Sequence, residues 1–206
     1  MAATGSASSL PSMSELASHI CNKIQSVFST SDGGNDRPSA LDIVVEEIAA
    51  VARKGRIFVH GVGREGLMLK ALCMRLAHLG LAAHVVGDVT TPPITSPDLL
   101  VASAGPGGFS TVEAICSIAR TVGARVLLLT AKPEGSAARL ASSVALVPAQ
   151  TMADGKEEEA PSSLLLPMGS LYEGALFVLF EMVVFRVAEL LEESPHTVTS
   201  RHTNLE

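Results

Sequence analysis

The sequence predicts an α/β protein built on a doubly wound, five-stranded parallel sheet. From Arg56 onward, short β-branched or leucine-rich runs alternate with segments of helical periodicity, and the runs lack the polar alternation of a half-exposed sheet. The expected strands are 57–60, 83–86, 98–103, 125–130 and 144–147. The expected helices between them are 65–79, 110–122 and 135–141. Helices are therefore expected on both faces of the sheet.

Three further helices flank this region. Apolar residues at near-helical spacing predict a helix over 12–29, and Pro38 is expected to open a second one that runs to Val51. A last helix from Gly169 onward has almost no polar face, which predicts burial on more than one side, including against a second copy of the chain. Residues 1–11 are expected to be a flexible terminus, and 12–206 a single domain, because 206 residues suffice for one ordinary α/β core.

Composition argues against several classes of function. The 15 basic and 21 acidic side chains give a formal net charge of −6 without a Lys/Arg cluster, and there is no Trp, so nucleic acid is not an expected partner. The three cysteines lie far apart, which suggests neither a disulfide framework nor a zinc site. The cysteines instead indicate buried thiols in a reducing compartment.

The chain is also expected to lie outside membranes. Its longest apolar stretch, 171–185, is interrupted by Glu173 and Glu181 and is too short to span a bilayer. The cytoplasm is the expected compartment. The first nine residues, small and hydroxyl-rich without Arg, resemble an organellar transit segment only weakly.

A glycine-rich turn, G-V-G-R-E-G, follows the first expected strand and opens a helix at 61–66. Such turns bind anions because the first N–H groups of a helix lack partners and the helix dipole favours negative charge. The candidate binding residues here are Gly61, Gly63, Arg64 and Glu65. Two alternatives stay open: a dinucleotide site, in which Asp88 would hold a ribose, and a purely structural tight turn.

A second turn, S-A-G-P-G-G-F-S-T at 103–111, again leaves a strand and enters a helix. In a doubly wound sheet both turns open at the carboxyl ends of strands, where ligands bind. The candidate ligand-binding residues are Ser103, Gly105, Gly107, Ser110 and Thr111, together with Thr130 at the end of the next strand.

Two residues near the end of the chain are candidates for chemistry. Glu173 stands in the first turn of the apolar last helix, where the dipole favours its ionised form and burial raises its pKa, a balance that suits a general base. The alternative is a first-turn glutamate favoured by the dipole alone. His202 lies in the tail S-R-H-T-N-L-E, where a histidine is usually just exposed to solvent.

Five separated segments together are similar to the sugar isomerase (SIS) domain, and specifically to its 3-hexulose-6-phosphate isomerase branch. The segments are R-I-F-V-H-G-V-G-R at 56–64, M-R-L-A-H-L-G at 74–80, V-G-D-V-T-T-P at 86–92, L-P-M-G-S-L-Y-E at 166–173 and R-H-T-N-L at 201–205. The resemblance runs from about residue 12 to the end. It implies a sheet of flavodoxin-like order, a homotetramer with sites at subunit interfaces, and a phosphosugar ligand without metal or nucleotide.

The resemblance also implies an activity. In this family a carbonyl moves between neighbouring carbons of a hexulose phosphate, giving fructose 6-phosphate through an enediol. By its place in the motif, Glu173 matches the proposed base. His202 matches a C-terminal histidine that assists ring opening or proton transfer from a neighbouring subunit.

Both turns depart from the family pattern. Glu65 replaces a serine, and the second turn reads A-G-P-G-G-F at 104–109 where the family has Ser-Gly-Ser-Gly and then a threonine. Each lost hydrogen bond to a charged group costs about 1.5–3 kcal/mol. Arg64, Lys132 or a neighbour's Arg201 are the residues expected to compensate. The competing hypothesis is a catalytically silent SIS protein that binds another sugar derivative or acts through other proteins.

Overall fold

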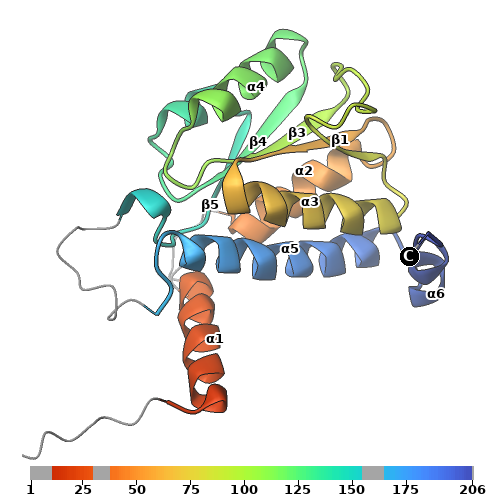
Figure 1. Ribbon diagram of the computed structural model, residues 1–206. Coiled ribbons are helices and arrows are strands. Elements are labelled where there is room, and N and C mark those ends of the chain that lie inside the picture. Colours follow the sequence, from red (N-terminus) through yellow and green to blue (C-terminus); the bar gives the residue numbers. More distant parts are fainter. Residues whose placement is uncertain (1–10, 30–37, 155–164, 206) are drawn as a thin grey trace, which may run out of the picture.

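The sheet has five parallel strands in the order β2-β1-β3-β4-β5 in the computed structural model, which describes residues 11–29, 38–154 and 165–205 (Figure 1). The strands are β1 Ile57–His60, β2 Ala83–Val85, β3 Leu99–Ser103, β4 Arg125–Thr130 and β5 Ser143–Leu146. The predicted fold class is confirmed, and no strand boundary differs from the expected one by more than a residue. The predicted flexible terminus, 1–11, lies almost wholly outside the described residues.

Helices cover both faces of the sheet. On one face are α2 (Ala40–Val51), α3 (Gly63–His78) and α5 (Ser170–Leu190), and on the other are α4 (Ser110–Thr121) and the 3₁₀ turn η1 (Ser136–Leu140). Two more helices are α1 (Met13–Ser29) and α6 (Pro195–Ser200). A short 3₁₀ turn, η2, covers Met152–Asp154.

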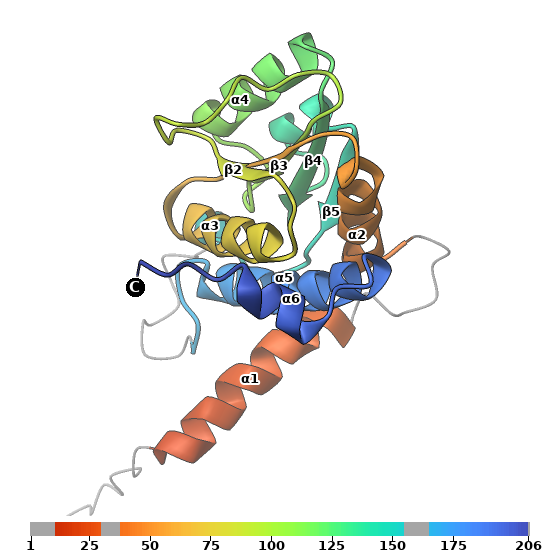
Figure 2. The same cartoon turned by 90° about the vertical axis from the view of Figure 1, so that its right-hand side faces the viewer.

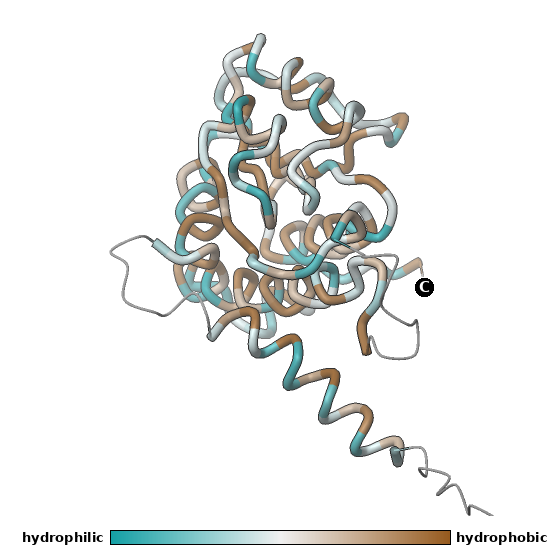
Figure 3. Tube along the Cα trace, turned by 90° about the vertical axis from the view of Figure 1, so that its left-hand side faces the viewer, coloured by the Kyte–Doolittle hydropathy of each residue, from teal (hydrophilic) through white to brown (hydrophobic). Residues whose placement is uncertain are grey.

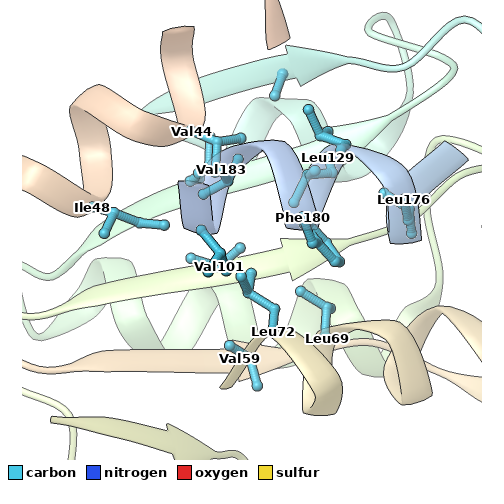
Figure 4. Packing of buried hydrophobic residues seen from close by; sticks show 14 of the residues in the cluster. Val44, Ile48, Val59, Leu69, Leu72, Val101, Leu129, Leu176, Phe180 and Val183 are labelled. Carbon is cyan, nitrogen blue, oxygen red and sulfur yellow. The ribbon is translucent and has the colours of Figure 1, made fainter. Parts of the chain in front are cut away.

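The core lies between α5 and the sheet. Leu176, Phe180 and Val183 of α5 face Val101 and Leu129 of the central strands, with α2 on one side and α3 on the other (Figure 4). Strands β3 and β4 are buried on both faces, which explains why their sequences lack polar alternation.

Two predicted helices begin or fold differently from the expectation. The second helix starts at Ala40, because the Ser39 side chain accepts a hydrogen bond from the Asp42 N–H while the Asp42 carboxylate accepts one from the Ser39 N–H. Pro38 therefore precedes the helix instead of opening it. The helix expected over 135–141 is only the five-residue 3₁₀ turn η1, as befits a connection this short between adjacent strands.

Two helices present apolar surface that the described part of the chain leaves open. Helix α1 extends away from the body of the molecule and buries only Val27 (Figures 1 and 2). Its hydropathy alternates along its whole length (Figure 3). In α5, Phe177 is 53% exposed and Phe185 63% exposed. Most of the helix packs against the sheet, α2, α3 and α1, so α5 is buried on more than one side within one chain.

At the amino ends of the strands, Asp98 ties β1 to β3. Its side chain is 1% exposed and accepts hydrogen bonds from the Arg56 N–H (2.8 Å), the Arg56 guanidinium (2.8 Å) and the Thr95 N–H (2.7 Å). Burial alone would raise the pKa of Asp98, but the hydrogen bonds from Arg56 and Thr95 outweigh it and lower the pKa to about 2. The carboxylate is therefore a structural anion at the edge opposite the two glycine-rich turns.

Asp98→Asn is expected to destabilise the protein by about 2–4 kcal/mol, because it leaves a partly buried guanidinium without its anion. The folded pKa is lower than the unfolded one, so this stabilisation is present above pH 3.8 and is lost as the pH falls towards about 2. Urea unfolding at pH 7 and pH 3 measures both effects. Asp88→Asn, at an exposed carboxylate, is the control, and an equal loss in that variant would contradict the assignment.

Candidate active site

The two glycine-rich turns lie side by side at the carboxyl edge of the sheet. The turn at 61–66 follows β1, the turn at 103–109 follows β3, and β1 and β3 are hydrogen-bonded neighbours. In this strand order, the crevice between them is where the chain switches direction and where α/β proteins bind ligands. Gly63 adopts a left-handed conformation with φ +57°, and a Cβ on Gly66 would lie 2.5 Å from the Gly61 carbonyl oxygen. These glycines allow α3 to begin directly over the end of β1.

Glu65 points into the second turn. Its side chain is 5% exposed and accepts hydrogen bonds from the Ser103 hydroxyl and, at 3.0 Å, from the Gly105 N–H. The Ser103 oxygen is also 3.3 Å from the hydroxyl of Tyr172, which is buried in the first turn of α5. A carboxylate from the first turn is thus bound to the donors of the second.

The electrostatics of this cluster do not favour the charge on Glu65. Burial raises the pKa of Glu65, the hydrogen bonds from Ser103 and Gly105 partly offset this, and the negative charge of Glu173 raises it further. Burial likewise raises the pKa of Tyr172 above its usual range, so its phenol stays protonated. The cluster holds a carboxyl group whose neutral form is favoured more than in water.

Arg64 and Glu173 form an ion pair that joins the starts of α3 and α5. The Arg64 Nη2 atom is 2.8 Å from Glu173 Oε2, and the same guanidinium donates to the Ser170 hydroxyl (2.8 Å) and to the Met168 carbonyl (2.6 Å). Glu173 is 15% exposed. Burial raises its pKa, and the charge of Arg64 acts against that rise.

The cations expected to compensate for Glu65 are all engaged elsewhere. Arg64 pairs with Glu173, Lys132 with Asp154 at 2.8 Å, and Arg201 with Glu193 at 2.8 Å. None of the three therefore pairs with Glu65 within this chain, and compensation through the ligand or through a neighbour's Arg201 stays a prediction. Arg64 is fixed by the start of α5, whereas Glu65, one residue further along the helix, faces β3.

The remaining residues of the second turn fall into two groups. Gly107, at φ +98°, donates its N–H to the Ala104 carbonyl, and the Thr130 hydroxyl lies 3.3 Å from the Gly105 carbonyl oxygen, so both maintain the turn. Ser110 and Thr111 are exposed in the first turn of α4, which has no side-chain cap. Helix N-termini without a cap offer N–H groups to an anion.

His202 does not lie near the other candidates within one chain. It follows α6, which lies beside the C-terminal end of α5, whereas Glu173 is at the N-terminal end (Figure 1). A 21-residue helix is about 31 Å long. The His202 ring stacks on His78 with centroids 5.2 Å apart, and its Nδ1 is 3.0 Å from the Thr203 carbonyl oxygen.

Two polar residues of this edge had no predicted role. Tyr172 is one of them. The sequence feature that could have revealed it is a hydroxyl group in an otherwise apolar helix. His60 is the other: it ends β1, and its Nε2 atom is buried with no hydrogen-bond partner among the described residues. Burial lowers the pKa of His60, which favours the neutral imidazole. A polar residue at the carboxyl end of an apolar strand was the available signal.

The described part of the chain shows neither a metal-binding cluster nor a membrane-spanning helix. No three His, Cys, Asp or Glu side chains in it are grouped to hold a metal ion. None of its helices combines the length and hydropathy that crossing a membrane requires. Asp88, the acid that a dinucleotide site would need, is exposed.

Several known proteins similar to this chain carry the same name, 3-hexulose-6-phosphate isomerase. No family model matches it. It is 37% identical over 172 residues to a 3-hexulose-6-phosphate isomerase of Mycobacterium gastri, covering 82% of this chain and 84% of that protein. It is 32% identical over 151 residues to a 3-hexulose-6-phosphate isomerase of Bacillus subtilis, covering 73% and 80%. A solved structure of a hypothetical Methanococcus jannaschii protein, inferred to be a 3-hexulose-6-phosphate isomerase, matches with a TM-score of 0.75 and 24% identity over 92% of this chain and 98% of that one.

The parallel sheet of order β2-β1-β3-β4-β5, together with the relatives at 37% and 32% identity, places the chain in the sugar isomerase (SIS) class of α/β proteins. Within that class, its relatives show that the chain belongs to the 3-hexulose-6-phosphate isomerase family. The resemblance seen in the five sequence segments is thereby confirmed.

Glu65→Gln is expected to raise the melting temperature at pH 8. The folded pKa of Glu65 is higher than its unfolded value, so its contribution to stability is full below pH 4.5 and is lost as the pH rises through the folded pKa. The difference between the variant and the natural protein should therefore shrink as the pH falls towards 5. Thermal melts from pH 5 to pH 8 test this, and a variant that melts lower at pH 8 would refute it.

Proposed function

We propose that this protein is a sugar isomerase that interconverts a 3-hexulose 6-phosphate and fructose 6-phosphate through an enediol. The observation that carries the proposal is Glu173, held by Arg64 at the carboxyl edge of the sheet, where the first glycine-rich turn opens α3. Its relatives support it, because the proteins from Mycobacterium gastri and Bacillus subtilis are both named 3-hexulose-6-phosphate isomerases.

The proposed chemistry is a proton transfer between neighbouring carbons. Glu173 takes the proton α to the carbonyl and returns it to the next carbon, and its partly buried position strengthens it as a base because burial raises its pKa. The negative charge that develops on the enediol oxygen needs a nearby donor, and the Arg64 guanidinium, 2.8 Å from Glu173, is positioned to supply one.

The proposed phosphate site involves the starts of two helices. The first turns of α3 and α4 have no side-chain caps, so their N–H groups are open to an anion. Gly61, Gly63 and Arg64 belong to the first, and Ser110 and Thr111 to the second.

Glu173→Gln is expected to lower kcat by about 10²–10⁴-fold with little change in KM, because the amide keeps the shape of the carboxylate but accepts no proton. A coupled assay that measures fructose 6-phosphate formation provides the readout. Glu189→Gln, at an exposed position near the C-terminal end of the same helix, is the control. Full activity in Glu173→Gln would refute its role as base.

We also propose that the protein is a homotetramer whose sites need two subunits. The large apolar side chains that α5 leaves exposed, Phe177, Phe185 and Leu190, offer a contact surface for a second copy. Because His202 lies at the far end of α5 from Glu173, its proposed acid–base role requires that it come from another copy. The predicted cytoplasmic location stays a prediction.

Mixing two inactive variants tests this arrangement. Glu173→Gln and His202→Asn are each expected to lack most activity, and subunit exchange between them should restore part of it, because a mixed pair of subunits contains one site with both natural residues. Glu173→Gln alone, taken through the same exchange procedure, gives the baseline activity. Absence of recovery in mixed oligomers, verified by mass, would mean that the two residues do not share a site between subunits.

A second candidate function has a specific observation in its favour. Glu65 puts a carboxylate on the Ser103 and Gly105 donors, which favours a protein that binds a different sugar derivative. The isomerase assay separates the candidates, since the second predicts no turnover of the hexulose phosphate.

A further inference from the structure

Glu65 bridges the ligand crevice of the sheet. Glu65 lies in the first turn of α3, directly after β1, and its carboxylate accepts a hydrogen bond from the turn after β3. The chain switches direction between these two neighbouring strands. The residue is not at the rim of the crevice, since its side chain is 5% exposed. An anion belonging to the protein itself therefore stands where a ligand anion would seek donors.

Residues 103–107 of the second turn have no hydrogen-bond donor left for another anion. The Ala104 N–H donates to the Leu129 carbonyl and the Gly107 N–H donates to the Ala104 carbonyl. Pro106 has no N–H. The Gly105 N–H and the single hydroxyl proton of Ser103 are both given to Glu65. After the end of β3, every N–H and hydroxyl donor of residues 103–107 is therefore already hydrogen-bonded within the protein, except at Pro106, which has none.

Among the described residues, no ion pair neutralises Glu65. The nearest cation in sequence, Arg64, is paired with Glu173, and the charge of Glu173 acts against that of Glu65. A phosphate dianion placed against Ser103 and Gly105 would meet a carboxylate in a poorly hydrated site, where repulsion between like charges is stronger than in water.

We propose that Glu65 sets the charge selectivity of the crevice: it excludes a phosphate from Ser103 and Gly105, so that an uncharged, hydroxyl-bearing part of the sugar lies there. Glu65 is thus a specificity-determining residue. The inference rests on the proposed function for the identity of the site, and it names the substrate class more closely: a sugar whose phosphate, when it carries one, is bound away from these two donors.

The test compares binding of fructose 6-phosphate and of fructose by calorimetry at pH 8. The proteins are the full-length natural chain, Glu65→Ser, and Glu65→Gln, which keeps the shape and an acceptor for the Gly105 N–H. Glu189→Gln is the control: it removes an equal charge from an exposed position near the C-terminal end of α5, away from both turns.

Both Glu65 variants should bind fructose 6-phosphate at least about tenfold more tightly than the natural chain does, because a charge is removed and, in Glu65→Ser, two donors are released. Their affinity for fructose should stay within about twofold, as should both affinities of Glu189→Gln. Inorganic phosphate alone should show the same gain as fructose 6-phosphate.

Three outcomes would overturn the proposal. They are an unchanged or weaker affinity for fructose 6-phosphate in both Glu65 variants, an equal gain for fructose, and an equal gain in Glu189→Gln. Inorganic phosphate is not turned over by an isomerase, so its binding gives a result that is independent of the isomerase assay. Selectivity that depends on Glu65 in a protein without isomerase activity would refute the proposed function alone, and an active enzyme without that dependence would refute this inference alone.

Discussion

The carboxylate of Glu65 is the constraint around which the carboxyl edge of the sheet is organised. It hydrogen-bonds to Ser103 and Gly105, and so joins the start of α3 to the turn after β3. Gly105 must be a glycine in this arrangement, because a Cβ there would lie 2.9 Å from the Tyr172 ring and 3.1 Å from the Glu65 carboxylate. A buried carboxyl group without a paired cation costs stability, which proteins tolerate most often at functional sites.

The neighbouring residue gives the edge its chemistry. Arg64 turns the other way and pairs with Glu173, so two successive residues of α3 hold two different elements, the turn after β3 and the start of α5. The opposite edge of the sheet is built differently: Asp98 has a cation and several donors and serves stability alone. Stability and the proposed chemistry are therefore assigned to opposite ends of the strands, as is usual for doubly wound sheets.

The sequence predicted the sheet, its strands and the two turns because burial on both faces and glycine-rich strand–helix junctions leave strong local patterns. It predicted that Glu65 brings an anion into the crevice, but not which donors it binds, because that depends on contacts 38 and 40 residues along the chain. The pairing of Arg64 with Glu173 and the buried role of Tyr172 were missed for the same reason. The role of His202 stays a prediction, since one chain places it at the far end of α5.

The most direct test of this account is a crystal structure of the natural protein with fructose 6-phosphate bound. The account predicts that the sugar lies within reach of the Glu173 carboxylate and that Glu65 remains on the Gly105 N–H, with the phosphate bound away from Ser103. A phosphate oxygen on Ser103 and Gly105, with Glu65 rotated out of the crevice, would contradict it.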